Sequence, residues 1–576
     1  MIGAGAVLMA VLFQQGDDVM AKAVDAILDA LEEGGVRCLF AIPDPAFLEL
    51  LAKAQARGFV LVAPHHEAAG GFMAEAAARL TGVPAAVLLS PGPGVANALP
   101  AMACARAERA PVLFLGGARG DLREPHLAGR FQHMDQMPLV AGAVKYAARI
   151  AAPGQAGAVV AHALMMARGG TPGPVYVDCP FPVMMGRGEQ GVPAPVPPVA
   201  GSGGLVRAAA MIGEAGSPLL LVGHGLDTQA RARVADLARV MACPVLLAPG
   251  AAALPGLAGQ CLPYGFSPVA TQAIARADLV LAIGTALGEA VHHGRRRHWR
   301  AGDEARRWIR IDGDVTANRP IDVALVGDAG VWAQALAGAL TPRESTPDPL
   351  FAAEAERLAQ WNAAARVHPA TPVHPARLVA EAMSALPPDA LLVRDGGSSV
   401  LFQLAQSRPH EGGVLWSRAF GHLGTGLPYA IGALAAEKAM GMPLRQALVL
   451  SGDSAMLFHM AEIEVAVRLA LPLVCVVAVD HQWGLEAAAY RQRLGADAPR
   501  PGADWGAATR FDQIARGFGA KGFYTDNADD LPAILERALA HGGPAVVHVA
   551  VDVQANGADL PGWAELASWY SDGMGA

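Results

Sequence analysis

Residues 446–486 form the stretch that most restricts how this chain can fold. They begin with a short apolar run, residues 447–450, which stops at a Ser-Gly-Asp-Ser turn, as a buried strand does. Apolar residues at helical spacing follow in residues 456–471, and a β-branched run comes after them. This order predicts a β-α-β unit. Because a right-handed crossover places the carboxyl ends of both parallel strands at one sheet edge, Asp453 and Asp480 should lie together there.

Two carboxylates at such an edge suit a hard cation that bridges a diphosphate. The small residues around Asp453 add backbone amides at the start of a helix, where an anion binds favourably. An ordinary turn between a strand and a helix would contain the same residues. The prediction of a metal and diphosphate site therefore depends on the other regions of the chain.

Apolar strands alternate with helices along three stretches of the 576-residue chain. The alternation predicts an α/β fold of three doubly wound parallel-sheet domains. We place them at residues 17–186, 205–341 and 373–558. A Pro/Gly-rich linker at residues 187–204 separates the first two, and a charged segment at residues 341–372 precedes the third.

Composition excludes several classes of function. With 17% charged residues and a net charge of −8, the chain lacks the basic surface that nucleic acids require. The six cysteines are scattered without Cys-x-x-Cys pairs, which is typical of reduced thiols in a cytoplasmic protein. Residues 1–13 are apolar but too short to span a bilayer, and we interpret them as an extension. No other segment predicts a membrane span.

Two further stretches carry chemical groups next to predicted turns. Glu67 follows the predicted strand at residues 60–63 and opens a helix, where an acidic residue gains only ~0.3–1 kcal/mol from the helix dipole. In the third domain, Gly-rich loops occupy residues 395–399 and 421–428, and small residues there can approach a phosphate. Each stretch alone also fits an ordinary turn. Together with the segment around Asp453 they make three candidate site segments in a fixed order along the chain.

The sequences of these three segments resemble motifs of the superfamily of acetolactate synthase, pyruvate decarboxylase and benzaldehyde lyase. The resemblance is carried by HHEAAGGFMAEAAARLTG at residues 65–82, by GHLGTGLP at residues 421–428, and by the Gly-Asp motif followed at a distance by Asp480. Ser454 replaces the last Gly of the family's Gly-Asp-Gly, and Val-Asp replaces its Asn-Asn. The resemblance implies thiamine diphosphate and Mg²⁺ as cofactors, with pyrimidine-binding, middle and diphosphate-binding domains. The implied metal ligands are Asp453, Asp480 and the backbone carbonyl of Gln482.

The resemblance also assigns the groups that hold the cofactor. It implies that Glu67 hydrogen-bonds the N1′ atom of the aminopyrimidine, that the Gly421 carbonyl receives the 4′-amino group, and that Leu423 props the cofactor into a bent shape. A carboxyl group at that place can share a proton with the pyrimidine. The remaining residues implied at the cofactor are Gly397, Ser398, Ser399, Gly452, Ser454, Ala455, Trp483 and Gly484.

The reaction is less restricted than the cofactor, because the superfamily fixes no single substrate. Gln132 resembles the residue that lines the substrate side in acetolactate synthases, which favours joining an acyl unit to a second molecule. Glu486 lies six residues after Asp480, where pyruvate decarboxylases place a proton relay. The segment around Trp483 is more similar to benzaldehyde lyase. His66 either donates to the substrate or packs, so the catalytic candidates are Glu67, His66, Gln132 and Glu486.

An acetolactate synthase-like carboligase acting on a 2-oxoacid or aldehyde is the leading hypothesis. The alternatives are a 2-oxoacid decarboxylase, a benzaldehyde lyase-like acyloin lyase, and a non-catalytic subunit that only binds the cofactor. The resemblance further implies a homodimer or homotetramer whose sites lie at subunit interfaces, with Glu67 and Asp453 from different subunits. Residues 283–294 do not match the Arg-rich run of acetolactate synthases, so FAD is doubtful.

Overall fold

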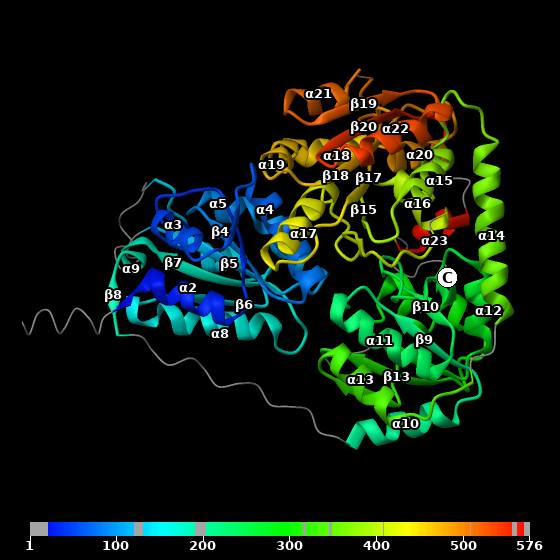
Figure 1. Cartoon of the computed structure of the whole chain (residues 1–576), viewed down its shortest axis with the longest axis horizontal. Helices are drawn as coiled ribbons and strands as arrows, with labels where there is room; N and C mark the ends of the chain where they lie inside the picture. Colours follow the sequence, from blue (N-terminus) through cyan, green and yellow to red (C-terminus); the bar gives the residue numbers. More distant parts are fainter. Residues whose placement is uncertain are drawn as a thin grey trace, which may run out of the picture. The chain divides into compact units, whose positions relative to one another are not determined.

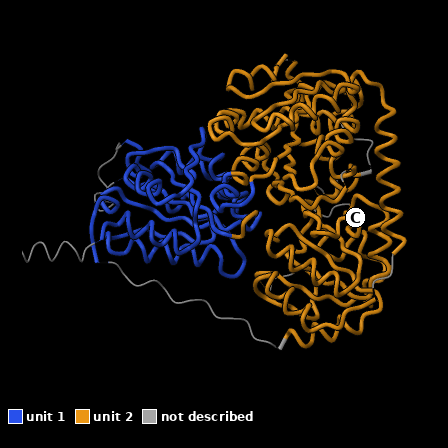
Figure 2. The backbone as a smooth tube through the Cα atoms, viewed as in Figure 1, with its two compact units in different colours: residues 1–79, 83–198, 435–443 blue, residues 80–82, 199–434, 444–576 orange. Residues whose placement is uncertain are grey.

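The structure is a computed structural model, and it divides into two compact units (Figure 2). Unit 1 holds the N-terminal domain, and unit 2 holds the middle and C-terminal domains; each unit is described by itself. The residues that the structure describes are 21–119, 131–189, 203–314, 318–344, 348–406, 408–506, 508–555 and 561–569. The expected extension at residues 1–13 and most of the expected linker at residues 187–204 lie outside them.

Unit 1 is built on a six-stranded parallel sheet with the order β3-β2-β4-β5-β7-β6 (Figure 1). A short antiparallel pair, β1 (Ala21–Lys22) with β8 (Arg187–Gly188), joins the two ends of the domain. The strands are β2 (Cys38–Ala41), β3 (Val60–Val62), β4 (Ala85–Leu89), β5 (Val112–Ala118), β6 (Tyr146–Arg149) and β7 (Val175–Pro180). The helices are α2 (Ala23–Glu33), α3 (Leu48–Ala56), α4 (Glu67–Thr81), α5 (Pro93–Asn97), α6 (Leu99–Ala107), α7 (Gln136–Val140), η1 (Pro153–Gln155), α8 (Ala156–Arg168) and α9 (Phe181–Met184).

The middle domain has a second parallel sheet, with the order β11-β10-β9-β12-β13-β14. Leu220 and Val222 of β9 belong to one core cluster and Leu219 and Leu221 to another, so apolar layers cover both faces. The strands are β9 (Pro218–Val222), β10 (Val245–Leu247), β11 (Cys261–Pro263), β12 (Leu279–Ile283), β13 (Arg307–Asp312) and β14 (Val323–Val326). The helices are α10 (Gly203–Glu214), α11 (Thr228–Met241), η2 (Ala258–Gln260), α12 (Pro268–Arg276), η3 (Glu289–Gly294), η4 (Arg297–Trp299) and α13 (Ala329–Ala339).

The C-terminal domain holds a third parallel sheet, with the order β16-β15-β17-β18-β20-β19. The strands are β15 (Leu391–Arg394), β16 (Val414–Leu415), β17 (Ala447–Gly452), β18 (Leu473–Val479), β19 (Lys521–Thr525) and β20 (Ala545–Ala550). The helices are α14 (Pro349–Arg366), α15 (Pro375–Ala385), α16 (Ser398–Gln406), α17 (Gly426–Ala439), α18 (Asp453–His459), η5 (Met460–Glu462), α19 (Ile463–Arg468), α20 (Gly484–Leu494), α21 (Phe511–Gly517), η6 (Ala528–Asp530), α22 (Leu531–Ala540) and α23 (Pro561–Trp569).

The predicted fold class, three doubly wound parallel-sheet α/β domains, is confirmed. In the first two domains the sequence did not predict β6, β11 and β14, and each of these is the outermost strand of its sheet. Edge strands pair on one side only, and β6 is half-buried at every residue. Their apolar signal is therefore weaker than that of the central strands.

The helix predicted at residues 456–471 begins earlier and is interrupted. It starts at Asp453 as α18, changes to the 3₁₀ turn η5, and resumes as α19. His459 leaves helical geometry with φ −137° and ψ 30°, and its Nδ1 lies 3.0 Å from the Gly424 carbonyl oxygen. This contact with a segment distant in sequence accompanies the break. None of the helices that the structure describes is long and apolar enough to cross a membrane.

Candidate active site

Three neighbouring strands at the centre of the C-terminal sheet each end next to an aspartate. Asp395 follows β15, Asp453 follows β17 and Asp480 follows β18. Because the strands are parallel, the three carboxyl groups lie at one edge of the sheet. Asp453 Oδ2 accepts hydrogen bonds from the backbone amides of Asp480 (3.1 Å) and His481 (2.7 Å). The structure thus brings together the pair that the β-α-β pattern predicted.

Asp453 is buried and Asp480 is half-buried, and the two side chains carry like charges. Burial and then the charge of Asp480 raise the pKa of Asp453 to about 7. Burial likewise raises the pKa of Asp480. Gln482 lies beside them, and its Nε2 donates to Asp480 Oδ2 at 3.0 Å. A divalent cation between the carboxylates would offset the desolvation that raises both pKa values and the charge of Asp480 that adds to it at Asp453.

The oxygen atoms around the pair fit such a cation. Gln482 Oε1 is buried and has no hydrogen-bond partner among the residues that the structure describes. Together with the carboxylates of Asp453 and Asp480 it makes a donor set of oxygen alone, which is what Mg²⁺ prefers. The residues present therefore fit Mg²⁺.

Glycines allow the loops after these strands to pack closely. A Cβ on Gly396 would lie 2.6 Å from Ser399 Oγ and 2.9 Å from the Gly452 nitrogen. A Cβ on Gly484 would lie 2.6 Å from Ser398 Oγ and 3.1 Å from Asp480 Oδ2. The starts of α16 and α20 thus converge with small residues and hydroxyls, and backbone amides at helix starts bind phosphate groups. The predicted residues Gly397, Ser398, Ser399, Gly452, Ser454, Ala455 and Gly484 all lie in these loops or at these helix starts.

Asp395 fixes the second Gly-rich loop, and sequence reasoning did not select it as a site residue. Its carboxyl oxygens accept from the backbone amides of Gly396 (2.8 Å), Gly424 (3.1 Å) and Gly426 (2.9 Å). Burial raises the pKa of Asp395 to about 6. The loop that it holds carries the exposed Gly421, with φ +69°, and the half-buried Leu423. The signal available in the sequence was its position, since Asp395 follows a strand just as Asp453 and Asp480 do.

Aromatic rings stand next to the predicted metal ligands. Trp483 packs edge-to-face on Phe458 at 6.2 Å and on Trp505 at 5.8 Å between ring centroids. Phe458 also meets the ring of His422 at 6.0 Å. Sequence reasoning selected Trp483 but missed Phe458, whose side chain is partly exposed on α18. Glu486 lies on the first turn of α20 with its side chain exposed.

In unit 1, Glu67 begins α4 and is half-buried. Its Oε2 accepts from Asn97 Nδ2 at 3.0 Å, and a Cβ on Gly94 would lie 3.2 Å from its Oε1. His66 Nδ1 accepts from the Ala68 amide at 3.1 Å, so this side chain caps the start of α4. His66 is otherwise exposed, so its catalytic role stays a prediction.

Gln132 lies against the loop after β4, which contains Gly92 and Gly94. A Cβ on Gly92 would be 2.8 Å from the Gln132 carbonyl oxygen, and Arg119 Nη2 donates to Gln132 Oε1 at 3.0 Å. Gln136 fixes this loop by a buried hydrogen bond, because its Oε1 accepts from the Gly92 amide at 2.7 Å. Of the three catalytic candidates in unit 1, Glu67 and Gln132 therefore border the loop after β4.

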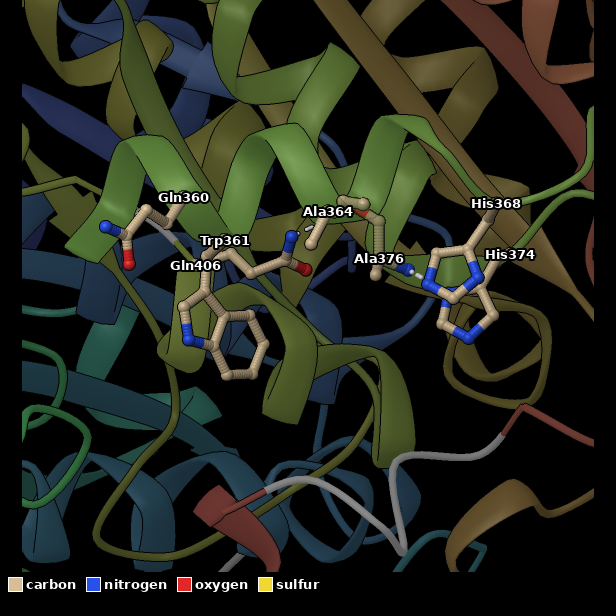
Figure 3. A pocket seen from close by; sticks show the side chains of 8 residues that line it. Gln360, Trp361, Ala364, His368, His374, Ala376 and Gln406 are labelled. Atoms are coloured by element: carbon tan, nitrogen blue, oxygen red, sulfur yellow. Dashed lines mark hydrogen bonds between the residues drawn. The ribbon is translucent and has the colours of Figure 1, made fainter. Parts of the chain in front are cut away.

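A separate cavity of about 380 Å³ opens between α14, α15 and α16 (Figure 3). The rings of His368 and His374 stack there with centroids 3.8 Å apart. Its lining residues are Gln360, Trp361, Ala364, Ala365, His368, His374, Ala376 and Gln406. None of them is a predicted site residue, so the candidate active site is distinct from this cavity.

Comparison with known proteins agrees with this arrangement. Three models of thiamine pyrophosphate enzymes match the chain: the N-terminal binding domain at residues 21–139, the central domain at residues 205–336 and the C-terminal binding domain at residues 395–549. The chain is also 30% identical to the acetolactate synthase large subunit IlvG of Mycobacterium tuberculosis over 544 residues, which cover 91% of this chain and 94% of that protein. The chain belongs to the thiamine pyrophosphate enzyme family.

Other members of the thiamine pyrophosphate enzyme family differ in their reactions. An oxalyl-CoA decarboxylase of Escherichia coli is 25% identical, over 93% of this chain and 96% of that protein. A solved structure of a thiamine diphosphate-dependent 4-hydroxybenzoylformate decarboxylase from Rhodococcus jostii superposes with a TM-score of 0.75 at 22% identity, covering 92% of this chain and 99% of that one. The superfamily recognised from the sequence is confirmed. The protein is a thiamine diphosphate-dependent enzyme.

Proposed function

We propose that this enzyme uses thiamine diphosphate and Mg²⁺ to join an acyl unit from a 2-oxoacid to a second carbonyl compound, as an acetolactate synthase-like carboligase. The observation that carries the metal assignment is the pair Asp453 and Asp480 beside Gln482 Oε1, a buried oxygen that has no hydrogen-bond partner within the described part of the chain. The reaction is supported by the similarity to the acetolactate synthase large subunit along nearly the whole chain. Gln132, beside the same loop as Glu67, supports it from within the site.

The proposal gives each group at the sheet edge a role. Asp453, Asp480 and the backbone carbonyl of Gln482 would hold Mg²⁺, with the Gln482 side-chain Oε1 as a further oxygen donor beside them, and the starts of α16 and α18 would bind the diphosphate. Leu423, in the loop that Asp395 holds, would support the bent cofactor. Trp483 would line one side of the site. Bound thiamine diphosphate supplies a carbon nucleophile for carbonyl groups. Glu67 would hold and exchange a proton with the pyrimidine.

The proposed reaction is tested by incubating the protein with thiamine diphosphate, Mg²⁺ and a panel of 2-oxoacids and aldehydes. Mass spectrometry should detect acyloins from the aldehydes, or 2-alkyl-2-hydroxy-3-oxo acids from the 2-oxoacids, together with carbon dioxide. Release of free aldehyde without carboligation would overturn the proposal. Cleavage of added acyloins as the main activity would instead support a benzaldehyde lyase-like reaction.

A decarboxylase is the second candidate, and the position of Glu486 favours it. This side chain is exposed on the first turn of α20, one turn after the proposed metal ligands, so it is free to carry a proton. If Glu486 releases the product by protonation, Glu486→Gln should raise the ratio of carboligation product to aldehyde. The matched control is Glu536→Gln, on the exposed face of α22.

The non-catalytic alternative and the other cofactor predictions have direct tests. Calorimetric titration with thiamine diphosphate and Mg²⁺ should show Mg²⁺-dependent binding, and a chain that binds but never turns over any substrate would be a cofactor-binding subunit. We expect the purified protein to lack the visible absorption of FAD. We also propose a homodimer or homotetramer that completes each site at a subunit interface, and a fully active monomer in analytical ultracentrifugation would contradict it.

A further inference from the structure

Three side chains that are far apart in the sequence meet inside unit 2, away from the proposed cofactor residues. His292 lies in η3, His298 in η4, and Glu565 in the C-terminal helix α23. One nitrogen from each histidine and one carboxylate oxygen all lie within 4.8 Å of one another. His292 and Glu565 are buried and His298 is half-buried. We call this set the His-His-Glu cluster.

The separations within the cluster match those between ligands of one tetrahedral zinc ion. Glu565 Oε2 lies 3.1 Å from His298 Nε2, and Glu565 Oε1 lies 3.5 Å from His292 Nδ1. Ligand atoms bound at ~2.0–2.2 Å with tetrahedral angles stand roughly 3.3 Å apart. The nitrogens of the two histidines lie within 4.8 Å of each other, so sharing one ion requires the side chains to move closer together.

An unsatisfied oxygen points into the same space. Glu565 is 2% exposed, and its Oε1 has no hydrogen-bond partner among the residues that the structure describes. A buried carboxylate oxygen without a donor is unfavourable, whereas a bound cation would satisfy it. Gly265 lies against this oxygen. A Cβ on Gly265 would be only 2.6 Å from it, so position 265 has no space for a side chain.

Outer contacts orient both imidazoles. His292 Nε2 lies 3.1 Å from Ser568 Oγ, and that hydroxyl donates to the Glu565 carbonyl oxygen at 2.6 Å. Because Ser568 uses its own hydrogen there, His292 Nε2 is the donor in this contact, and His292 Nδ1 keeps a lone pair that faces the Tyr264 hydroxyl at 2.7 Å. His298 Nδ1 in turn lies 3.2 Å from Thr271 Oγ1. Metal-bound histidines typically have such a partner on the second ring nitrogen.

Two groups compete with an ion at the cluster. The Tyr264 hydroxyl lies 2.7 Å from His292 Nδ1, and Arg297 Nη1 lies 3.7 Å from Glu565 Oε2. The hydroxyl can rotate its hydrogen away. The arginine side chain is 30% exposed, so its cationic group can turn toward solvent. A turn of the hydroxyl hydrogen leaves the Tyr264 oxygen in place, so an ion at His292 Nδ1 would have to displace that oxygen.

We propose that the His-His-Glu cluster binds one zinc-class divalent ion, which clips α23 onto the middle domain. Two imidazoles with one carboxylate favour Zn²⁺ over Mg²⁺, which prefers oxygen ligands alone. The site is separate from the proposed Mg²⁺ ligands. It does not depend on the proposed reaction.

The test uses the full chain saturated with thiamine diphosphate and excess Mg²⁺. After exposure to Zn²⁺ and desalting, elemental analysis should find one zinc per chain in the wild type. Glu565→Gln and His298→Ala should each lower zinc retention at least tenfold. Two exposed positions of the C-terminal domain serve as matched controls, and Glu536→Gln and His541→Ala should retain zinc. No retained zinc in the wild type, or equal retention in the Glu565 and His298 variants, would overturn the proposal.

Two further measurements separate a specific site from misfolding and from the Mg²⁺ site. Zn²⁺ should slow hydrogen exchange in residues 561–569 at least tenfold in the wild type and not in Glu565→Gln, while circular dichroism of that variant stays unchanged. Unchanged hydrogen exchange in the wild type would overturn the proposal that the ion holds α23 onto the middle domain. Asp453→Ala should still retain zinc, and its loss there would place the ion at the proposed Mg²⁺ ligands and overturn the cluster as a site.

Discussion

The first and third sheets of this protein share one topology but present different chemistry. Numbered from its own first strand, each sheet has the order second, first, third, fourth, sixth, fifth. In the N-terminal sheet the candidate group, Glu67, follows β3, an edge strand, and its carboxyl is half-buried. In the C-terminal sheet Asp395, Asp453 and Asp480 follow three adjacent strands and all have a raised pKa.

The difference shows that the place of a strand in the sheet sets the environment of the residue after it. A group after a central strand has neighbours on both sides, so it is desolvated and suited to hold a cation. A group after an edge strand keeps one open side, so it remains available to another molecule. The following substitutions probe this contrast between metal anchor and proton-exchange group.

The largest effect is expected from Asp453→Ala. It removes a proposed metal ligand, so the Kd for thiamine diphosphate in the presence of Mg²⁺ should rise at least 100-fold, or about 3 kcal/mol. Calorimetric titration measures it. Asp497→Ala, at an exposed position, removes the same charge and should leave binding unchanged. Binding that survives Asp453→Ala would remove the metal-anchor role from this edge of the sheet.

Glu67→Gln should separate turnover from binding. Loss of the proton-exchanging carboxyl is expected to lower kcat about 10²-fold or more, while the Kd for thiamine diphosphate changes little. Steady-state kinetics and calorimetry on the same sample test this, with the exposed Glu33→Gln as the control. Unchanged turnover would refute the role of Glu67.

The same variant can locate the site between subunits. If Glu67 and Asp453 of one site come from different subunits, a mixed dimer of Glu67→Gln and Asp453→Ala chains contains one intact site and one doubly altered site. Such dimers, purified with two affinity tags, should recover activity that neither parent shows. Lack of recovery would mean that each chain builds its own site.

A smaller effect is expected from Asp480→Asn, which restores the family's usual residue. Removing one of two like charges should stabilise the cofactor-free protein by about 1–2 kcal/mol, since one pKa unit corresponds to about 1.4 kcal/mol. Mg²⁺ should bind about tenfold more weakly, because a neutral amide oxygen replaces a carboxylate. Denaturant unfolding and Mg²⁺ titration measure both. A less stable variant would contradict the repulsion between Asp453 and Asp480.

The last expected effect is confined to a narrow pH range and concerns Asp395. Its pKa is about 6 in the folded chain against an ordinary 3.8, so folding takes up a proton between these values. The stability that this group contributes is greatest below about pH 4 and falls by at most about 3 kcal/mol as the pH rises to about 6. Asp395→Asn should flatten this part of the stability profile. Unfolding curves from pH 4 to pH 7 test it, with Asp497→Asn as the control, and an equally steep profile would contradict the shift.

Much of the fold could be predicted because it depends on local patterns. The apolar runs that become β4, β9 and β18 are buried on both faces, and their composition alone indicates parallel strands. The residues at their ends also follow from the sequence, because parallel strands align their carboxyl ends. The amino-acid sequence by itself is therefore enough to pair Asp453 with Asp480.

Only the tertiary structure decided contacts between segments that no local pattern relates. The break after α18 coincides with the contact between His459 and Gly424, and Asp395 acquires its partners through the fold of residues 421–426. The His-His-Glu cluster joins His298 to Glu565, which lie 267 positions apart in the chain. Sequence periodicity reports which face of an element is buried. It carries no information on which distant side chain the packing brings to that face.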